Sequence, residues 1–224
     1  MKKRISLITA IVLFAIITQA QRNVSFGLRG GINFQNINGK DEEGNKLDNE
    51  MVTGFHLGII SEIAVAPQFY FQPGLLYTVK GAKNKEEEFG ETIKTKVKIS
   101  YLELPLNLVY KPNLGNGRLL LGFGPYVGFG IGGKVTYKEG GSSLKQEIKF
   151  KNKVSVNDPE DVAYFKPLDA GVNMLAGYEF SNKVSFQLNT QLGLTKINPK
   201  YEGSVNDKTA AKNTGFGFSL GYRL

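Results

Sequence analysis

Residues 119–131 read LLLGFGPYVGFGI, and large apolar residues alternate with glycine along this stretch. The odd positions carry Leu, Phe, Val or Ile apart from Pro125, and the even positions carry Gly apart from Leu120 and Tyr126. Successive side chains point to opposite faces of a β-strand. The pattern therefore predicts a strand with one apolar face and one face of small or polar residues.

Seven other stretches repeat this period of two, at residues 24–34, 53–63, 69–80, 96–110, 168–180, 184–194 and 214–224. Each is long enough for a membrane-spanning strand, which needs about 9 to 11 residues. Within 96–110, Val97, Ile99 and Tyr101 fall on the opposite phase to the leucines at 102–108. We therefore predict a β-bulge near Tyr101 that returns these three residues to the apolar face.

The segments between the predicted strands alternate between short and long. Short turns are predicted at 64–68, 111–118 and 181–183, and long polar loops at 35–52, 81–95, 134–165 and 196–212. The third long loop is expected to continue its strands as a β-ribbon. This alternation is typical of outer-membrane barrels, which have tight periplasmic turns and longer extracellular loops.

Two barrels fit eight up-and-down strands, a soluble one with its apolar face inside and a membrane barrel with its apolar face outside. Several dozen large side chains would not fit the interior of an eight-stranded barrel. The Gly, Ser, Asn and Gln face would also make a poor soluble exterior. We therefore predict an all-β fold, an eight-stranded antiparallel up-and-down transmembrane β-barrel with four long extracellular loops.

The N-terminus predicts export. Lys2, Lys3 and Arg4 precede an apolar run at 5–17, and small residues follow, as in a signal peptide cleaved near Ala20/Gln21. A single-pass signal anchor is the alternative. We assign 1–20 to the signal peptide and 21–224 to the barrel domain. Removing the three N-terminal cations lowers the formal charge from +8 to +5 (8 minus 3), so the charge argues little for nucleic-acid binding.

The composition restricts the chemistry. The 224 residues include no Cys and one His, which excludes disulfides, thiolate metal sites and a cysteine nucleophile. No metal site and no cofactor are predicted. The ligand spacing in the acidic loop at 36–51 matches no EF-hand, and whether this loop binds calcium stays open.

Residues 101–111 (YLELPLNLVYK) followed by 121–134 (LGFGPYVGFGIGGK) resemble the hallmark pair of the PorT-like outer-membrane β-barrel family. The resemblance extends over essentially the whole mature chain. It implies a porin-like, eight-stranded barrel in the outer membrane of a Gram-negative cell. Some members of that family are tied to envelope secretion machinery, so the resemblance implies a secretion-machinery or other envelope protein as a possible partner.

The polar face predicts a network inside the lumen. Charges in so narrow a space must be paired or hydrated. We place Arg29 and Glu103 near mid-barrel, and Glu62, Glu179 and Arg223 near the periplasmic mouth. The full predicted network contains Arg29, His56, Glu62, Tyr70, Gln72, Lys80, Glu103, Asn107, Tyr126, Asp169, Glu179 and Arg223.

These features predict a monomeric, non-enzymatic envelope protein with a plugged lumen, whose loops meet outer-membrane lipid, lipopolysaccharide or a protein partner. No catalytic residue and no nucleic-acid partner are predicted. A narrow porin-like channel is the first alternative. The second is a lipid-modifying enzyme that uses His56, for which Ser142, Ser143 and Asp169 could complete the site.

Overall fold

The computed structural model describes residues 24–88, 91–204 and 207–224, and strands dominate them. The predicted signal peptide lies outside these residues. The strands are β1 (Val24–Asn38), β2 (Val52–Ala66), β3 (Phe69–Glu88), β4 (Glu91–Tyr110), β5 (Asn113–Leu114), β6 (Gly117–Glu139), β7 (Ser142–Phe150), β8 (Lys153–Val154), β9 (Ala163–Phe165), β10 (Leu168–Glu179), β11 (Val184–Gly193), β12 (Lys200–Tyr201) and β13 (Lys212–Arg223). No helix in this part of the chain could cross a membrane.

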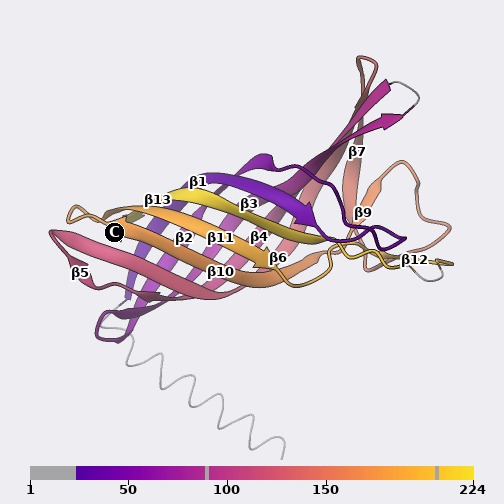
Figure 1. Cartoon of the computed structure of the whole chain (residues 1–224). Coiled ribbons are helices and arrows are strands. Elements are labelled where there is room, and N and C mark those ends of the chain that lie inside the picture. The colour runs from indigo at the N-terminus through magenta and orange to yellow at the C-terminus, as the bar shows by residue number, and fades with distance from the viewer. Residues whose placement is uncertain (1–23, 89–90, 205–206) are drawn as a thin grey trace, which may run out of the picture.

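Eight of these strands close into a ring (Figure 1). Its order is β1, β2, β3, β4, β6, β10, β11 and β13, and every neighbouring pair is antiparallel. The first and last strands pair from Gly27↔Arg223 to Asn38↔Lys212, which completes the cylinder. The predicted eight-stranded up-and-down barrel is confirmed.

The two ends of the barrel differ as expected. At one end β2 and β3 are joined by Pro67 and Gln68 alone, and Gln68 adopts a left-handed backbone with φ of 66°. The C-terminus lies at this same end (Figure 1). All the long connections leave from the other end, which is therefore the extracellular one.

The apolar face points outward. Leu57, Phe123 and Leu220 are 62%, 64% and 63% exposed, values that only a lipid environment explains for so many large side chains. The inward positions of the same strands are mostly polar and buried. Near the short-turn end, outward aromatics form a belt in which the Phe69 and Tyr110 rings stack with centroids 4.8 Å apart.

The prediction of a long loop at 81–95 is wrong. β3 and β4 continue pairing from Gly81↔Lys98 to Glu88↔Glu91, so most of this segment is a hairpin. Alternation persists there, with lysine replacing leucine on the outer face because the strands have left the lipid. The third long loop contains the expected ribbon, formed by β6 and β7 from Lys134↔Glu147 to Glu139↔Ser142.

The predicted bulge lies near Tyr101 as expected, but it does not return Ile99 and Tyr101 to the outer apolar face. Tyr101 pairs with Gly130 and Ser100 with Gly132, so the additional residue is Ile131 of β6. β4 keeps its phase, and both Ile99 and Tyr101 point inward with no exposed surface. These residues belong inside because the extracellular end of the lumen is apolar.

An apolar cap closes that end. Its buried members are Ile37, Ala82, Ile99, Tyr101, Val135, Ile148, Ile197 and Ala211, drawn from five strands and the loop before β13. Backbone hydrogen bonds hold that loop in place, since Ile197 N donates to Ala211 O at 2.9 Å and Lys166 N to Ile197 O at 2.7 Å. The cap lies directly above the polar lumen.

Candidate functional site: the closed lumen

An upper ion cluster of Lys80, Glu103 and Asp169 lies below the apolar cap. Lys80 Nζ is 2.7 Å from Glu103 Oε2 and 3.0 Å from Asp169 Oδ2. The three side chains come from β3, β4 and β10, and at most 2% of any of them is exposed. One ammonium group therefore bridges two carboxylates across the barrel.

Neutral side chains complete the coordination of the upper ion cluster. Asn213 Nδ2 donates to Asp169 Oδ2 at 3.0 Å, and Gln191 Nε2 donates to Glu103 Oε1 at 2.7 Å. The Tyr126 hydroxyl donates to Asp169 Oδ1 at 3.3 Å, and its ring centroid is 4.1 Å from Lys80 Nζ. Hydrogen bonds of this kind lower the desolvation cost of buried charge.

A lower ion cluster of Glu62, Lys111, Glu179 and Arg223 lies toward the short-turn end. Lys111 Nζ is 2.9 Å from Glu62 Oε2 and 2.7 Å from Glu179 Oε2. Arg223 Nη2 reaches Glu179 Oε1 at 3.1 Å. Lys111 has no exposed side-chain surface, whereas Arg223 is 28% exposed and faces the periplasmic mouth.

Arg29 extends the lower ion cluster toward mid-barrel. Arg29 Nη2 donates to Gln72 Oε1 at 2.6 Å, and Gln72 Nε2 donates to Glu62 Oε1 at 2.9 Å. The Tyr70 ring centroid is 5.2 Å from Lys111 Nζ, so it covers this cluster from the side. Arg29 is therefore connected to Glu62 through an amide rather than by direct contact.

The charges of the two ion clusters and Arg29 balance, and Arg118 adds one cation at the short-turn end, where its Nη1 lies 3.4 Å from the Tyr70 hydroxyl. The balanced cations are Arg29, Lys80, Lys111 and Arg223, and the anions are Glu62, Glu103, Asp169 and Glu179. Four positive and four negative charges give a net charge of zero (4 minus 4). An interior with so little excess charge attracts neither anions nor cations strongly, and every carboxylate in it has a basic or amide partner.

His56 lies between the two ion clusters in a histidine network with Asn33, Thr78, Ser219 and Asn189. Nδ1 is 2.6 Å from Asn33 Oδ1 and Nε2 is 2.7 Å from Ser219 Oγ. Asn33 Nδ2 donates to Thr78 Oγ1, and Asn189 Nδ2 donates to Ser219 Oγ. These partners assign the proton to Nδ1, and the Ser219 hydroxyl donates to Nε2.

Gly31 is required beside this network. A Cβ there would lie 1.9 Å from Phe218 O and 2.7 Å from His56 Cε1. The glycine excess therefore reflects close approach of neighbouring backbones as well as a narrow lumen.

A cavity of about 50 Å³ remains at mid-lumen. Arg29, His56, Glu103 and Asn107 are among the residues that line it. A buried water occupies at least about 10–15 Å³ measured in this way, so the space suits a few water molecules. The two ion clusters and the apolar cap leave little room for a larger ligand.

The structure places all twelve predicted residues on the inner face and brings most of them together. Glu103 belongs to the upper ion cluster and Arg29 to the lower one. Asp169 contacts Lys80 rather than His56, and Ser142 and Ser143 lie at the β6–β7 turn. The histidine therefore has none of the partners that the enzyme alternative proposed.

Several lumen residues were missed, above all Lys111 and Ser219. Lys111 was assigned to a turn, although its odd position continues the inward series of Asn107 and Val109. Ser219 is one of many small residues on the inner face. Parity could have identified Lys111, whereas the pairing of Ser219 with His56 depends on closure of the ring.

The described residues contain no group of three or more His, Cys, Asp or Glu that could hold a metal ion. In the acidic first loop, Asp41 Oδ1 accepts hydrogen bonds from Gly44 N at 2.8 Å and Asn45 N at 2.7 Å. Asp41 therefore caps a turn of its own backbone.

The chain is similar to known outer-membrane proteins over most of its length. The family described as "Outer membrane protein beta-barrel domain" matches residues 19–198. No curated protein matches. Similar solved structures include Neisserial surface protein A, with 13% identity over 90% of this chain and 99% of that chain, at a TM-score of 0.42. They also include the Ail protein of Yersinia pestis bound to a heparin analogue, with 14% identity over 90% of this chain and 99% of that chain, at a TM-score of 0.39. An outer membrane channel from Pseudomonas putida F1 has 9% identity over 90% of this chain and 96% of that chain, at a TM-score of 0.30.

Proposed function

The chain belongs to the outer-membrane β-barrel family, and on that premise we propose that it is a non-enzymatic envelope protein that acts through its extracellular segments. The predicted location in the outer membrane is confirmed by this membership. The likeness to the PorT-like group stays a prediction. We further propose that the protein is a monomer whose extracellular segments contact lipopolysaccharide or an envelope protein.

The observation that carries the proposal is the filled lumen, in which almost every charge is paired. Lys80 and Asp169 in the upper ion cluster and Lys111 in the lower one have at most 1% of their surface exposed, so each cluster closes the lumen at its own level. A conducting pore needs a continuous water-filled path lined by groups that attract its ion. A barrel closed by paired charges and by the apolar cap supports a structural role instead.

Planar-bilayer recordings test this proposal against the channel alternative. The wild-type protein is expected to give no resolved open-channel steps. A triple variant, Glu62→Ser, Lys111→Ser and Glu179→Ser, removes two negative charges and one positive charge together with much of the lower plug. This variant is the positive control, because its opened lumen is expected to conduct ions. Channel steps of the wild type comparable to those of the variant would contradict the proposal.

A lipid hydrolase is the second candidate, because one observation favours it. Asn33, His56 and Ser219 have the order of orienting group, base and hydroxyl that activates a serine nucleophile. However, Ser219 is 1% exposed and faces the lumen, while the acyl chains lie on the opposite face of its strand. A lipid ester could not reach its Oγ without opening the barrel.

Labelling with a fluorophosphonate probe distinguishes the two candidates. We expect no adduct at Ser219 in the folded protein and no release of fatty acid from phospholipid or lipopolysaccharide. The Ser219→Ala variant is the control for background labelling. An adduct that the wild type forms and Ser219→Ala loses, together with lipid hydrolysis, would establish the enzyme.

A further inference from the structure

The two extracellular hairpins carry a continuous basic surface. β3 and β4 project beyond the barrel together with β6 and β7 (Figure 1), and β4 pairs with β6 as far as Lys94↔Lys138. Lysines occupy most outward positions of this extension, which we call the lysine face. Its members are Lys83, Lys85, Lys94, Lys96, Lys98, Lys134, Lys138, Lys145 and Lys149.

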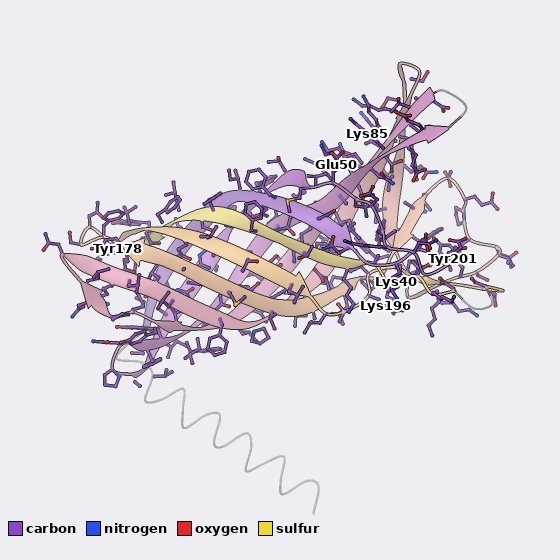
Figure 2. All side chains as sticks on the ribbon, in the orientation of Figure 1. Lys40, Glu50, Lys85, Tyr178, Lys196 and Tyr201 are labelled. Atoms are coloured by element: carbon purple, nitrogen blue, oxygen red, sulfur yellow. The ribbon has the colours of Figure 1, made fainter. Side chains whose placement is uncertain are left out.

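The orientation of the lysine face follows from strand alternation. The intervening residues Ala82, Ile99, Val135 and Ile148 are buried in the apolar cap. All the lysines of the face are exposed except Lys98, which is partly buried. Figure 2 places Lys85 on the projecting hairpins, far from Tyr178 at the other end of the barrel. The face is therefore the solvent side of a sheet whose other side packs on the cap.

Many of these lysines stand directly opposite one another. The register pairs Lys83 with Lys96, Lys85 with Lys94, and Lys98 with Lys134. Lys94 also faces Lys138 on its other side. Like charges directly opposite in a sheet destabilise it. A row of such pairs therefore needs counter-charge from outside the sheet.

The chain itself supplies little of that counter-charge. Among the described residues, Lys83 is the one lysine of the face with an ion pair, to Glu50 at 2.8 Å. Glu87 and Glu147 share the face by alternation, but no ion pair forms to them in this part of the structure. Eight of the nine lysines of the face thus have no ion pair within the described residues, and their ammonium groups are left for an external anion.

The height of the lysine face above the membrane indicates which anion. The outward apolar band of β4 ends at Leu102, which is 42% exposed, and that of β6 ends at Ile131, which is 53% exposed. Lys98 follows four residues beyond Leu102, or about 13 Å at 3.3 Å per residue. The face therefore begins in the headgroup layer and continues outward by about the same distance to Lys94.

We propose that the lysine face binds the phosphorylated saccharide headgroup of the glycolipid that forms the outer leaflet. This proposal rests on the proposed function and names the partner of its extracellular segments. Lysines whose backbones lie about 4.8 Å apart across strands and about 7 Å apart along them can place several ammonium groups on a ligand that carries several phosphates on a saccharide. The adjoining Leu102 and Ile131 surface would receive its acyl chains.

Titration of the refolded full-length mature protein in neutral detergent micelles tests the proposal. The probes are bisphosphorylated lipopolysaccharide, the same lipopolysaccharide after dephosphorylation, and inorganic phosphate. The face variant combines Lys96→Gln, Lys98→Gln and Lys134→Gln. The matched control combines Lys40→Gln, Lys46→Gln and Lys208→Gln, which removes the same charge from exposed positions of the first and fourth loops.

The face variant is expected to bind the bisphosphorylated probe about 100-fold more weakly, since each lysine near an anionic surface contributes about fivefold. The control is expected to change less than about threefold, because its lysines are remote from the face. Binding by the wild type should fall to a similar extent with the dephosphorylated probe. Millimolar inorganic phosphate should not displace the glycolipid.

Three outcomes would overturn the proposal. Equal losses of affinity in the face variant and the control would mean that only the net charge of the protein determines binding. Undiminished binding by the face variant would assign the face to a protein partner, and displacement by inorganic phosphate would assign it to free phosphate. The single variant Lys98→Gln, which retains the rest of the face, replaces the triple variant if that one fails to refold. Bilayer recordings on the same samples show separately whether the closed barrel itself is intact.

Discussion

Lysine occupies two opposite environments in this molecule. Inside the barrel, Lys80 and Lys111 each contact two carboxylates at 2.7–3.0 Å and have no exposed side-chain surface. On the lysine face, Lys94 and Lys98 stand across from other lysines in water. The fold neutralises the side chain in the first place, whereas in the second the part of the chain that the structure describes supplies no ion pair to it.

The difference shows where the fold itself needs ion pairs. A charge that cannot reach water must be paired within the chain, because its desolvation costs several kcal/mol. A charge in water can be left for an external ligand at the cost of weak repulsion. The lumen is therefore expected to govern stability, and the outer surface to govern interaction.

The largest expected effect comes from Lys80→Met. It leaves Glu103 and Asp169 buried without a cation, which should lower the free energy of unfolding by about 3–5 kcal/mol. Urea unfolding in micelles, followed by the mobility shift of the folded barrel on gels, measures it. A matched triple variant, Lys80→Met with Glu103→Gln and Asp169→Asn, should recover most of the loss. A triple variant as unstable as the single one would contradict the role of charge.

Lys111→Met should lower the free energy of unfolding by a smaller amount, about 2 kcal/mol. Here Glu179 keeps its contact with Arg223 at 3.1 Å, and Glu62 keeps the hydrogen bond from Gln72 at 2.9 Å. The same unfolding assay compares the two ion clusters. A loss greater than that of Lys80→Met would reverse their order.

On the outer surface, by contrast, replacing a lysine should raise the free energy of unfolding. Lys98→Glu places a carboxylate opposite Lys134, so the free energy of unfolding should rise by about 0.2–1 kcal/mol. Lys98→Gln is the control for removing charge alone and should give a smaller rise. Destabilisation by Lys98→Glu would mean that the lysine pairs are already compensated within the chain.

The smallest effect concerns pH and the extracellular loops. A hydrogen bond from Lys151 lowers the pKa of Asp158 below 3.8. Two hydrogen bonds lower the pKa of Glu202 below 4.5, the larger effect coming from Ser155 and the smaller from Lys153. Carboxylates with lowered pKa values stabilise the folded loop above their unfolded pKa, and this contribution is lost as the pH falls through the folded pKa.

Hydrogen exchange in residues 151–164 should therefore be slow and constant from pH 7 to about 5, after correction for intrinsic rates, and lose protection below about pH 4.5. Lys151→Gln with Lys153→Gln should remove most of this pH dependence. Protection that increases on acidification would contradict the assignment.

Most of the barrel could be predicted from alternation alone. In residues 214–224 the apolar residues keep one parity, as they do in 119–131 apart from Leu120 and Tyr126, and a membrane barrel accommodates eight such faces. Loop lengths then fixed which end is extracellular. The hairpin at 81–95 was missed because its outer face is lysine rather than leucine, although its period is still two.

The interior could be predicted only as a set of residues. Parity places Lys80 and Asp169 on the inner face, but they are 89 positions apart, and their contact depends on the tilt and stagger of the closed sheet. Ile99 and Tyr101 were turned outward because an apolar inner face was not expected. That face exists because a cap closes the extracellular end, a feature that no single strand encodes.

The pairing of β1 with β13 also bears on how the protein enters its membrane. Until β1 and β13 pair, both edges of the open sheet present unpaired backbone groups that lipid cannot satisfy. The partners in the lumen likewise come from distant strands, as Ser219 and His56 show. Insertion should therefore be all-or-none, with the pairing of β1 and β13 as the step that closes the sheet, and a chain shortened before residue 212 should remain with its chaperones in the periplasm.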